Sequence, residues 1–326
     1  MDVRAALKQG ISQLRDAHVP SFTLAAELLL LHVLGRDRTW LYAHPEELIA
    51  ETDAERFQQL LARRAAGEPT QHLTGRQEFW GLDLEVTPDV LIPRPETEHI
   101  IEVALDRLAV REIRAGRKQT LTGEGLYIAD IGTGSGCISI GLAKELPSAR
   151  FLAIDISAAA LAVARHNAER HSFSDRIQFL ESNLFEAISV GARYIVPLHP
   201  DLTANIRNES PVTSHQSPSS DQSPLFDLIV SNPPYIGRNE RAMLQREVRD
   251  HEPDVALYGG EEGYEFYAGL IAVAARFLKP GGLLILELGH NSLPAVQPLL
   301  DPPNWKAVGV TKDLAGIERV IAAERT

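Results

Sequence analysis

The chain has 326 residues, enough for about two domains that each bury a core of their own. Its net charge of −12 argues against a general binder of nucleic acid or of anionic membranes, because both need a dominant basic surface. One cysteine excludes a disulfide framework and a cysteine-rich zinc site. Met1–Arg4 lacks the apolar core of a signal peptide, and the apolar run Leu24–Leu34 is too short to span a bilayer, so we expect a cytoplasmic protein.

Residues 1–66 have the periodicity of helices. Apolar side chains recur at helical spacing at Val3, Leu7, Ile11 and Leu14 and again at Leu24, Leu28, Leu31 and Leu34. Gly35 is placed to end the second of these helices, and Thr52–Glu55 has the pattern of a capping box that opens a third helix through Arg64. No residue here is typical of catalysis, and the pattern leaves open whether the region recognises a substrate or only packs.

A change of composition at Gly67 marks a link between two domains. Turn residues separate three short extended pieces, Gln77–Trp80, Leu82–Val86 and Val90–Ile92. We therefore expect a helical domain over residues 1–75 and a β-hairpin linker over residues 76–93. A helix through Val110 follows, and then a polar connection over residues 111–124.

From residue 126 onward strands alternate with helices, which predicts an α/β domain with a mostly parallel sheet and helices on both faces. The expected helices lie near residues 137–145, 158–170 and 262–278. The expected strands are Leu126–Ile131, Phe151–Ile156, Ile177–Leu180, Asp227–Ser231, Leu283–Glu287, Ala307–Thr311 and Arg319–Ala323.

One segment interrupts this alternation within the domain that we assign to residues 94–326. Residues 209–224 contain six serines and three prolines and almost nothing apolar. Such a composition buries too little surface to offset the entropy lost on ordering. We expect a low-complexity insertion at about residues 188–224, tolerated on the surface or used as a partner-binding arm.

A glycine-rich turn follows the first expected strand, where Gly132, Thr133, Gly134, Ser135 and Gly136 precede a helix. Glycines at such a turn let the backbone approach a ligand closely. The spacing differs from the dinucleotide-binding pattern, which disfavours an oxidoreductase, and it lacks the ending of a phosphate-binding loop. Asp155 closes the next strand, where a carboxylate can accept hydrogen bonds from a ribose. Its alternative role is that of an acid favoured by the start of a helix.

The most specific motif is Asn232-Pro233-Pro234-Tyr235, which ends the buried strand Asp227–Ser231. Consecutive prolines fix the backbone and remove two N–H donors, so this turn presents carbonyl groups. The side-chain oxygen of Asn232 and the carbonyl of Pro233 could accept both hydrogens of an –NH₂ group on a planar ligand, and Tyr235 could stack beneath it. Cys137, at the helix start after the glycine-rich turn, could have a lowered pKa, but a packing role suits its size better.

Together these motifs resemble S-adenosylmethionine-dependent methyltransferases that act on amino nitrogens. The whole chain outside residues 188–224 resembles the glutamine-N5 methyltransferases of peptide chain release factors in particular. That resemblance rests on Gly67–Pro69, Glu78–Leu82, Leu91–Glu98, Glu252-Pro253, Ala256-Leu257 with Gly259-Gly260, and Asp313–Gly316.

The resemblance implies a Rossmann-like, seven-stranded methyltransferase domain, preceded by a small helical domain that recognises the release factor and by the hairpin. It also implies that the chain methylates the glutamine of the Gly-Gly-Gln motif of that partner. We expect a monomer, and a transfer that needs no metal because the extra proton can leave to solvent. Residues implied to bind S-adenosylmethionine are Gly132, Thr133, Gly134, Ser135, Gly136, Asp155, Asn183, Leu184 and Asn232. Residues implied to hold the substrate glutamine are Asn232, Pro233, Pro234 and Tyr235.

Three positions depart from the family pattern. Asn183 replaces the usual Asp, although its side-chain oxygen can still accept a hydrogen bond from adenine, and Leu184 replaces a frequent aromatic residue. Ile317 stands where a basic residue is common. Alternatives that stay open are methylation of a ribosomal-protein glutamine, methylation of a nucleic-acid amino group, and cofactor binding without catalysis.

Overall fold

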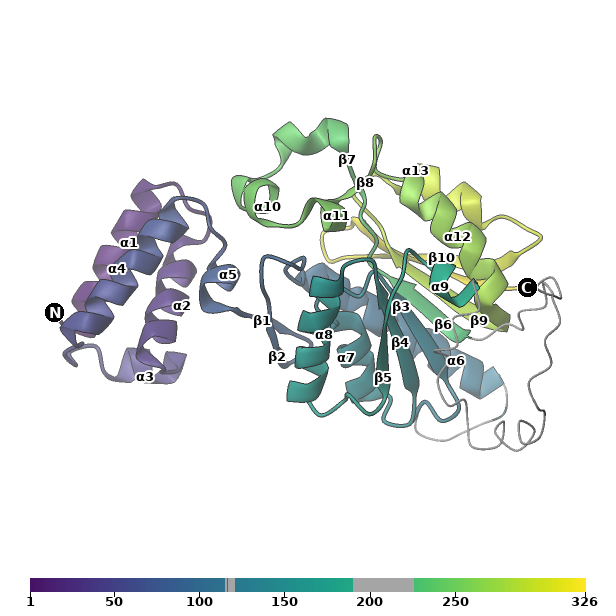
Figure 1. The fold of residues 1–326 in the computed structure, drawn as a ribbon, viewed down its shortest axis with the longest axis horizontal. Helices are drawn as coiled ribbons and strands as arrows, with labels where there is room; N and C mark the ends of the chain where they lie inside the picture. Colours follow the sequence, from purple (N-terminus) through teal and green to yellow (C-terminus); the bar gives the residue numbers. More distant parts are fainter. Residues whose placement is uncertain (115, 117–120, 190–225) are drawn as a thin grey trace, which may run out of the picture.

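The computed structural model describes residues 1–114, 116, 121–189 and 226–326, in which a helical bundle lies beside a larger α/β domain (Figure 1). The bundle consists of α1 (Val3–Asp16), α2 (Phe22–Leu34), α3 (Arg38–Ala43), α4 (Glu51–Ala65) and the short α5 (Thr70–Thr74). Its apolar side chains form a core separate from that of the α/β domain. At Gly10 of α1 an added Cβ would lie 2.8 Å from the Phe57 ring of α4, so the close approach of these helices depends on a glycine.

The observed ends of two helices test the two helix-end predictions made from the sequence. Gly35 ends α2 as expected, and its φ of 62° is the left-handed conformation typical of a glycine at a helix end. The capping box predicted at Thr52–Glu55 is wrong, because α4 begins at Glu51 and Ala50 precedes it without a side-chain cap. The Ala50 carbonyl already accepts the first helical hydrogen bonds, so Thr52 lies inside the first turn.

The expected hairpin is present. Strands β1 (Arg76–Phe79) and β2 (Leu82–Glu85) pair antiparallel, and both turn residues between them, Trp80 and Gly81, have positive φ. That combination is typical of a type I′ turn, whose twist suits a two-residue hairpin. The extended piece predicted at Val90–Ile92 forms no strand, and the Ile92 N–H donates to a side chain instead of a neighbouring strand.

The α/β domain is built on seven strands in the order β10-β11-β9-β6-β3-β4-β5, which confirms the predicted fold class. Four neighbouring pairs are parallel, and β11 runs antiparallel to both of its neighbours. The strands are β3 (Tyr127–Ile131), β4 (Arg150–Asp155), β5 (Ile177–Glu181), β6 (Phe226–Ser231), β9 (Leu278–Glu287), β10 (Trp305–Lys312) and β11 (Glu318–Arg325).

Helices cover both faces of this sheet, as the alternation predicts (Figure 1). One apolar core lies under α6 (Glu98–Arg114) and α7 (Cys137–Glu145), and α8 (Ala158–Arg170) contacts the neighbouring strands β4 and β5. A second core on the opposite face lies under α12 (Glu265–Phe277). Near its edge are the short helices α9 (Glu186–Ser189), α13 (Leu293–Val296) and η4 (Gln297–Leu300).

Between β6 and α12 the chain forms small elements that the sequence pattern did not indicate. In chain order they are β7 (Ile236–Gly237), η3 (Arg238–Met243), α10 (Arg246–His251), α11 (Asp254–Leu257) and β8 (Tyr258–Gly260), and η1 (Pro95–Thr97) precedes α6. Strands β7 and β8 pair in a small parallel sheet of their own. Most of the expected insertion lies outside the described residues, but its proposed start at residue 188 falls within α9. Among the described residues no helix is long and apolar enough to cross a membrane.

Candidate active site

Two cavities adjoin at the carboxyl ends of the central strands. The larger, of about 490 Å³, is lined by the turns after β3, β4 and β5. The smaller, of about 310 Å³, lies beside the turn after β6 and is walled by residues 243–245, Val248 and residues 256–257. Asn232 lines both cavities. In an open α/β sheet this edge is where ligands bind, so a group held in one cavity can meet a group held in the other at Asn232.

The glycine-rich turn after β3 forms an open part of the larger cavity. Gly132 and Gly134 have φ of 70° and 55°, and a Cβ added to either would meet nothing within 4 Å. Below the turn, the buried Asp130 accepts hydrogen bonds from the Thr133 hydroxyl at 2.7 Å and from the backbone and hydroxyl of Ser139. Burial raises the pKa of Asp130 to about 6 despite these donors. The turn is therefore held from beneath while its upper side is free for a ligand.

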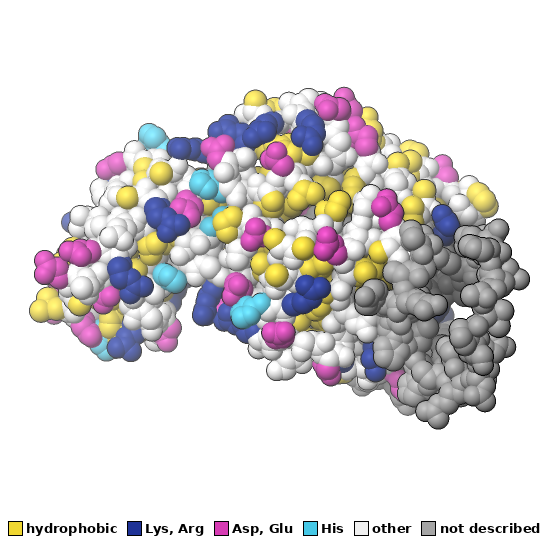
Figure 2. Space-filling view, viewed as in Figure 1, with side chains coloured by type: hydrophobic (Ala, Val, Ile, Leu, Met, Phe, Trp, Pro, Cys, Tyr) yellow, Lys and Arg dark blue, Asp and Glu magenta, His cyan; other side chains and the backbone are white. Residues whose placement is uncertain are grey.

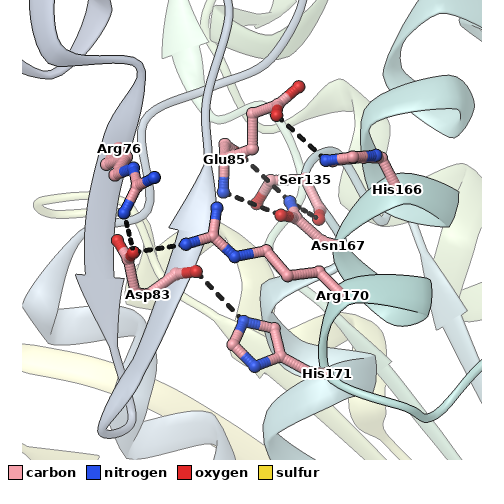
Figure 3. A network of polar contacts seen from close by, with 8 residues as sticks. All are labelled: Arg76, Asp83, Glu85, Ser135, His166, Asn167, Arg170 and His171. Atoms are coloured by element: carbon pink, nitrogen blue, oxygen red, sulfur yellow. Dashed lines mark hydrogen bonds and ion pairs between the residues drawn. The ribbon is translucent and has the colours of Figure 1, made fainter.

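Asn167 of α8 fixes the same turn to the hairpin (Figure 3). Its Nδ2 donates to the Ser135 carbonyl at 3.0 Å and to the Glu85 carbonyl at 2.9 Å, and its Oδ1 accepts from the Glu85 N–H at 2.7 Å. Around it, Arg170 pairs with Asp83 at 2.6 Å. Asn167 is fully buried, so water cannot replace these hydrogen bonds. This one side chain therefore satisfies three backbone groups and links the hairpin to the glycine-rich turn.

Replacing Asn167 by Leu should lower the free energy of unfolding by about 2–4 kcal/mol, because three backbone groups lose their partner in a buried place. Urea unfolding would measure the change. A matched control is His166→Ala, which removes an exposed pair with Glu85 at 3.2 Å and should cost less than about 0.5 kcal/mol. Equal effects of the two substitutions would contradict the role given to Asn167.

Asp155 ends β4 at the floor of the larger cavity. Its Oδ2 accepts from the Gly134 N–H at 2.9 Å, and its Oδ1 accepts from the Ser157 N–H at 2.9 Å, at the start of α8. Burial raises the pKa of Asp155, and these two backbone donors oppose that rise. The Asp155 carboxylate therefore binds the start of α8, as its alternative role predicts. It also lines the larger cavity, where a ribose would need an acceptor.

Asn183 and Leu184 follow β5 and line the same cavity. Asn183 donates from Nδ2 to Glu186 at 2.8 Å, which leaves its Oδ1 as an acceptor. Leu184 has φ of 50°, an uncommon conformation for a residue with a side chain, and it packs against the core under α12. This turn offers an amide oxygen and an apolar surface to a flat ring.

The turn after β6 carries the Asn-Pro-Pro-Tyr motif. Asn232 donates from Nδ2 to the Thr97 hydroxyl at 3.1 Å, and no described residue donates to its Oδ1. Pro233 and Tyr235 line the smaller cavity and Pro234 lines the larger one. The Tyr235 hydroxyl donates to Glu287 at 3.3 Å, which holds the ring at the cavity wall. Asn232 therefore presents an unused carbonyl oxygen where the two cavities adjoin.

Most of the predicted site residues thus come together, with one exception. Gly136 does not line either cavity. It precedes α7 with φ of 83°, and an added Cβ would lie 3.2 Å from the Ala164 Cβ of α8, so its described role is close packing. Burial raises the pKa of the Cys137 thiol to about 12, which fits the packing role and not a reactive thiolate.

Several residues of the site were not singled out from the sequence. Thr97 contacts Asn232 from 135 positions earlier in the chain, although it lies within the Leu91–Glu98 stretch that carried the family resemblance. Glu287 ends β9 at the same sheet edge, and the reasoning applied to Asp155 at the end of its strand would have found it. Arg238, Tyr258 and Phe266 also line the larger cavity and had no signal in the pattern.

In this seven-stranded sheet the glycine-rich turn, the strand-end acid and the Asn-Pro-Pro-Tyr turn adjoin one cavity. That combination defines the class of this protein as a methyltransferase. Residues 123–191 match a family model described as a methyltransferase domain, and residues 5–75 match one described as the PrmC N-terminal domain.

Curated relatives give the particular family. The release factor glutamine methyltransferase of Koribacter versatilis is 37% identical over 325 residues, which cover 100% of this chain and 99% of that protein. The protein of the same name from Burkholderia pseudomallei is 38% identical and covers 92% of this chain and 91% of its own length. The chain belongs to the release factor glutamine methyltransferase family, which confirms the resemblance seen in its motifs.

Among solved structures, a release-factor-specific protein-(glutamine-N5) methyltransferase from Alicyclobacillus acidocaldarius is 26% identical. It covers 74% of this chain and 99% of its own, with a TM-score of 0.39.

Proposed function

We propose that this enzyme transfers a methyl group from S-adenosylmethionine to the side-chain amide nitrogen (N5) of the glutamine in the Gly-Gly-Gln motif of release factors. The observation that carries the proposal is the position of Asn232. Its Oδ1 is an unused acceptor between two adjoining cavities, and its Nδ2 is held by Thr97. An amide –NH₂ needs such an acceptor, next to the place of a methyl donor.

The larger cavity has the groups that S-adenosylmethionine requires. Gly132 and Gly134 leave room for close backbone contact, Asp155 offers a carboxylate to the ribose, and Asn183 and Leu184 offer an acceptor and an apolar surface to the adenine. The cofactor would supply a methyl group on a positively charged sulfur. Gly136 is left out of these contacts and keeps a packing role.

The smaller cavity suits the glutamine side chain. An amide nitrogen is a poor nucleophile because its lone pair is delocalised into the carbonyl. Hydrogen bonds from its two N–H groups to Asn232 Oδ1 and to the Pro233 carbonyl would restrict the amide and favour a lone pair out of its plane. Tyr235, half-buried at the wall, gives the amide a flat surface. Orientation of the nitrogen is the enzyme's main contribution, and the extra proton can leave to solvent.

The helical domain, residues 1–75, is the proposed recognition domain for the release factor. It contacts the catalytic domain through the buried Arg64, which pairs with Glu247 of α10 at 2.6 Å. A groove of about 230 Å³ lies beside this pair, and Leu24 and Leu28 of α2 line it while remaining partly exposed. Apolar side chains at a groove between two domains suit a folded protein partner better than a nucleic acid.

Arginines gather over η3 and α10, above the hydrophobic side chains in the hollow of this face (Figure 2). Several are already paired with neighbouring acids, for example Arg249 with Asp250 at 2.8 Å and Arg246 with the same residue at 3.6 Å. Because neighbouring acids already pair with these arginines, this part of the described surface lacks the dominant unpaired basic charge that binding of an RNA backbone needs. We expect a monomer that acts in the cytoplasm, where release factors work.

A competition assay tests the substrate. The enzyme and methyl-labelled S-adenosylmethionine would be incubated with release factor, ribosomal proteins and ribosomal RNA in one mixture, and the products separated. We expect the label on the release factor. Label on a ribosomal protein or on RNA, with the release factor unlabelled, would favour one of the two alternative substrates and overturn the proposal.

A further inference from the structure

Glu287 is a buried carboxylate next to the Asn-Pro-Pro-Tyr turn, where it holds the Tyr235 hydroxyl. It ends β9, the strand beside β6, and only 2% of it is exposed. Its Oε1 accepts from the Tyr235 hydroxyl at 3.3 Å, whereas its Oε2 has no hydrogen bond within the described part of the chain. A buried carboxylate with so few donors is costly, which calls for an explanation beyond packing.

Thr97 lies between Glu287 and Asn232. Its side chain is buried, its Oγ1 accepts from Asn232 Nδ2 at 3.1 Å, and it is close enough to Glu287 to lower the pKa of that carboxyl. A hydroxyl group has a single hydrogen, so a threonine that accepts from Asn232 must donate elsewhere. The carboxylate of Glu287 is the acceptor at hand. A Thr97 hydrogen turned toward this carboxylate would complete a series in which Asn232 donates to Thr97 and Thr97 donates to Glu287.

We propose that Glu287 is a positioning residue for methyl transfer: its ionised carboxylate fixes, through Thr97, which end of the Asn232 amide faces the substrate. The proposal rests on the function given above, in which Asn232 Oδ1 accepts a hydrogen of the glutamine –NH₂. While Glu287 accepts from Thr97, the hydroxyl can only accept from Asn232, so Nδ2 is held inward and Oδ1 points outward. Tyr235 is held by the same carboxylate.

Protonation of Glu287 allows the series to reverse. A neutral carboxyl can donate to Thr97, and Thr97 can then donate to Asn232 Oδ1 with the amide turned over. The Asn232 –NH₂ would then face the –NH₂ of the substrate, two donors with no acceptor between them. Burial raises the pKa of Glu287 to about 7, with the Thr97 and Tyr235 hydroxyls opposing the rise. Both forms are therefore populated near neutral pH, and turnover should fall as pH falls.

Five other titratable or charged side chains interact electrostatically with Glu287. They are Tyr235, Tyr267, Cys137, Arg319 and Glu96. Burial raises the pKa of both tyrosines and of the thiol, so all three stay neutral. Arg319 lowers the pKa of Glu287 and Glu96 raises it. Asp130, whose pKa is about 6, lies under the glycine-rich turn, so its protonation should change cofactor affinity and not turnover at saturating cofactor.

The test is the pH dependence of kcat between about pH 5.5 and 8.5, at saturating cofactor and release factor. For the parent we expect kcat to fall below a pKa near 7. Glu287→Gln should lower kcat about tenfold at pH 8 and abolish this acidic limb, with KM for release factor and Kd for cofactor unchanged. Thr97→Val should do the same, and Thr97→Ser should restore the limb and most of the rate. Glu169→Gln, an exposed glutamate on α8, is the control and should keep the parent profile.

A Glu287→Gln enzyme with the parent kcat and the parent acidic limb would overturn the proposal and leave Glu287 a packing residue. If that variant does not fold, Thr97→Val and Thr97→Ser provide the test, because a Thr97→Val enzyme with an unchanged pH profile would also overturn the proposal. These outcomes differ from failure of the proposed function, in which the parent enzyme itself would not label release factor at any pH.

Discussion

An Asn232→Ala enzyme should turn over at least about 100-fold more slowly than the parent at saturating cofactor and release factor, as expected when a contact that orients the reacting group is lost. Asn232 supplies one of the two acceptors for the substrate amide, and the alanine removes it. The glycine-rich turn and Asp155 are untouched, and their hydrogen bonds do not involve Asn232. Cofactor affinity should therefore stay close to that of the parent. Single-turnover rates and calorimetry would measure the two quantities separately.

Asn239→Ala provides a matched control, because Asn239 is an exposed asparagine on the segment that follows the same turn. We expect its rate and cofactor affinity to equal those of the parent. A near-normal rate for Asn232→Ala would remove Asn232 from the mechanism. A large loss of cofactor affinity in the same variant would instead make it mainly a cofactor residue.

Asp155→Ala should weaken cofactor binding by about 2–4 kcal/mol, which is roughly 30- to 1,000-fold in Kd. Two effects add. The ribose loses a charged acceptor, and the Gly134 N–H loses the carboxylate that now fixes the turn. KM for release factor should change little, because Asp155 does not line the smaller cavity. Calorimetric titration with S-adenosylmethionine would measure Kd, and a melting curve would show that the variant is folded.

Asp155→Asn separates charge from shape, because it keeps one acceptor oxygen and loses the negative charge. We expect its Kd for S-adenosylmethionine to lie between the Kd of the parent and that of Asp155→Ala. The exposed Asp301→Ala is the control for a change of net charge. An Asp155→Ala enzyme with the parent Kd would show that Asp155 serves only the start of α8.

Much of the fold and the cofactor side of the site could be predicted from the sequence, because their signals are local. A strand, a glycine-rich turn and a helix follow one another within a few residues, and Asp155 ends one buried strand while Asn232 directly follows another. All seven strands of the sheet were found from runs of apolar residues. The strand order then brings these turns to one edge, since parallel strands end on the same side.

The support of the site could not be predicted, because it depends on contacts between distant segments. Thr97 and Asn232 are 135 residues apart, and Asn167 reaches Glu85 across 82 residues. A polar side chain in a helix or a short turn has the same local pattern whether it is exposed or buried. Only the packing of α8 against the hairpin, and of β9 beside β6, shows which polar side chains lose water and must find partners.

The errors have local causes as well. At α4, Thr52 followed three residues later by Glu55 has the pattern of a capping box, although the helix has already begun at Glu51. At Val90–Ile92 the apolar residues have the pattern of a strand, but no neighbouring strand pairs with them and Glu252 satisfies the Ile92 N–H. A short pattern of side chains therefore defines a strand only where backbone partners exist.

The most direct test of the central claim is to map the methyl group on a release factor by fragment-ion mass spectrometry after incubation with the enzyme and S-adenosylmethionine. We expect one added methyl, on the side chain of the glutamine in the Gly-Gly-Gln motif, and none at the same time point with Asn232→Ala. A methyl group on any other residue, or the same methylated glutamine formed at the parent rate by Asn232→Ala, would contradict the central claim.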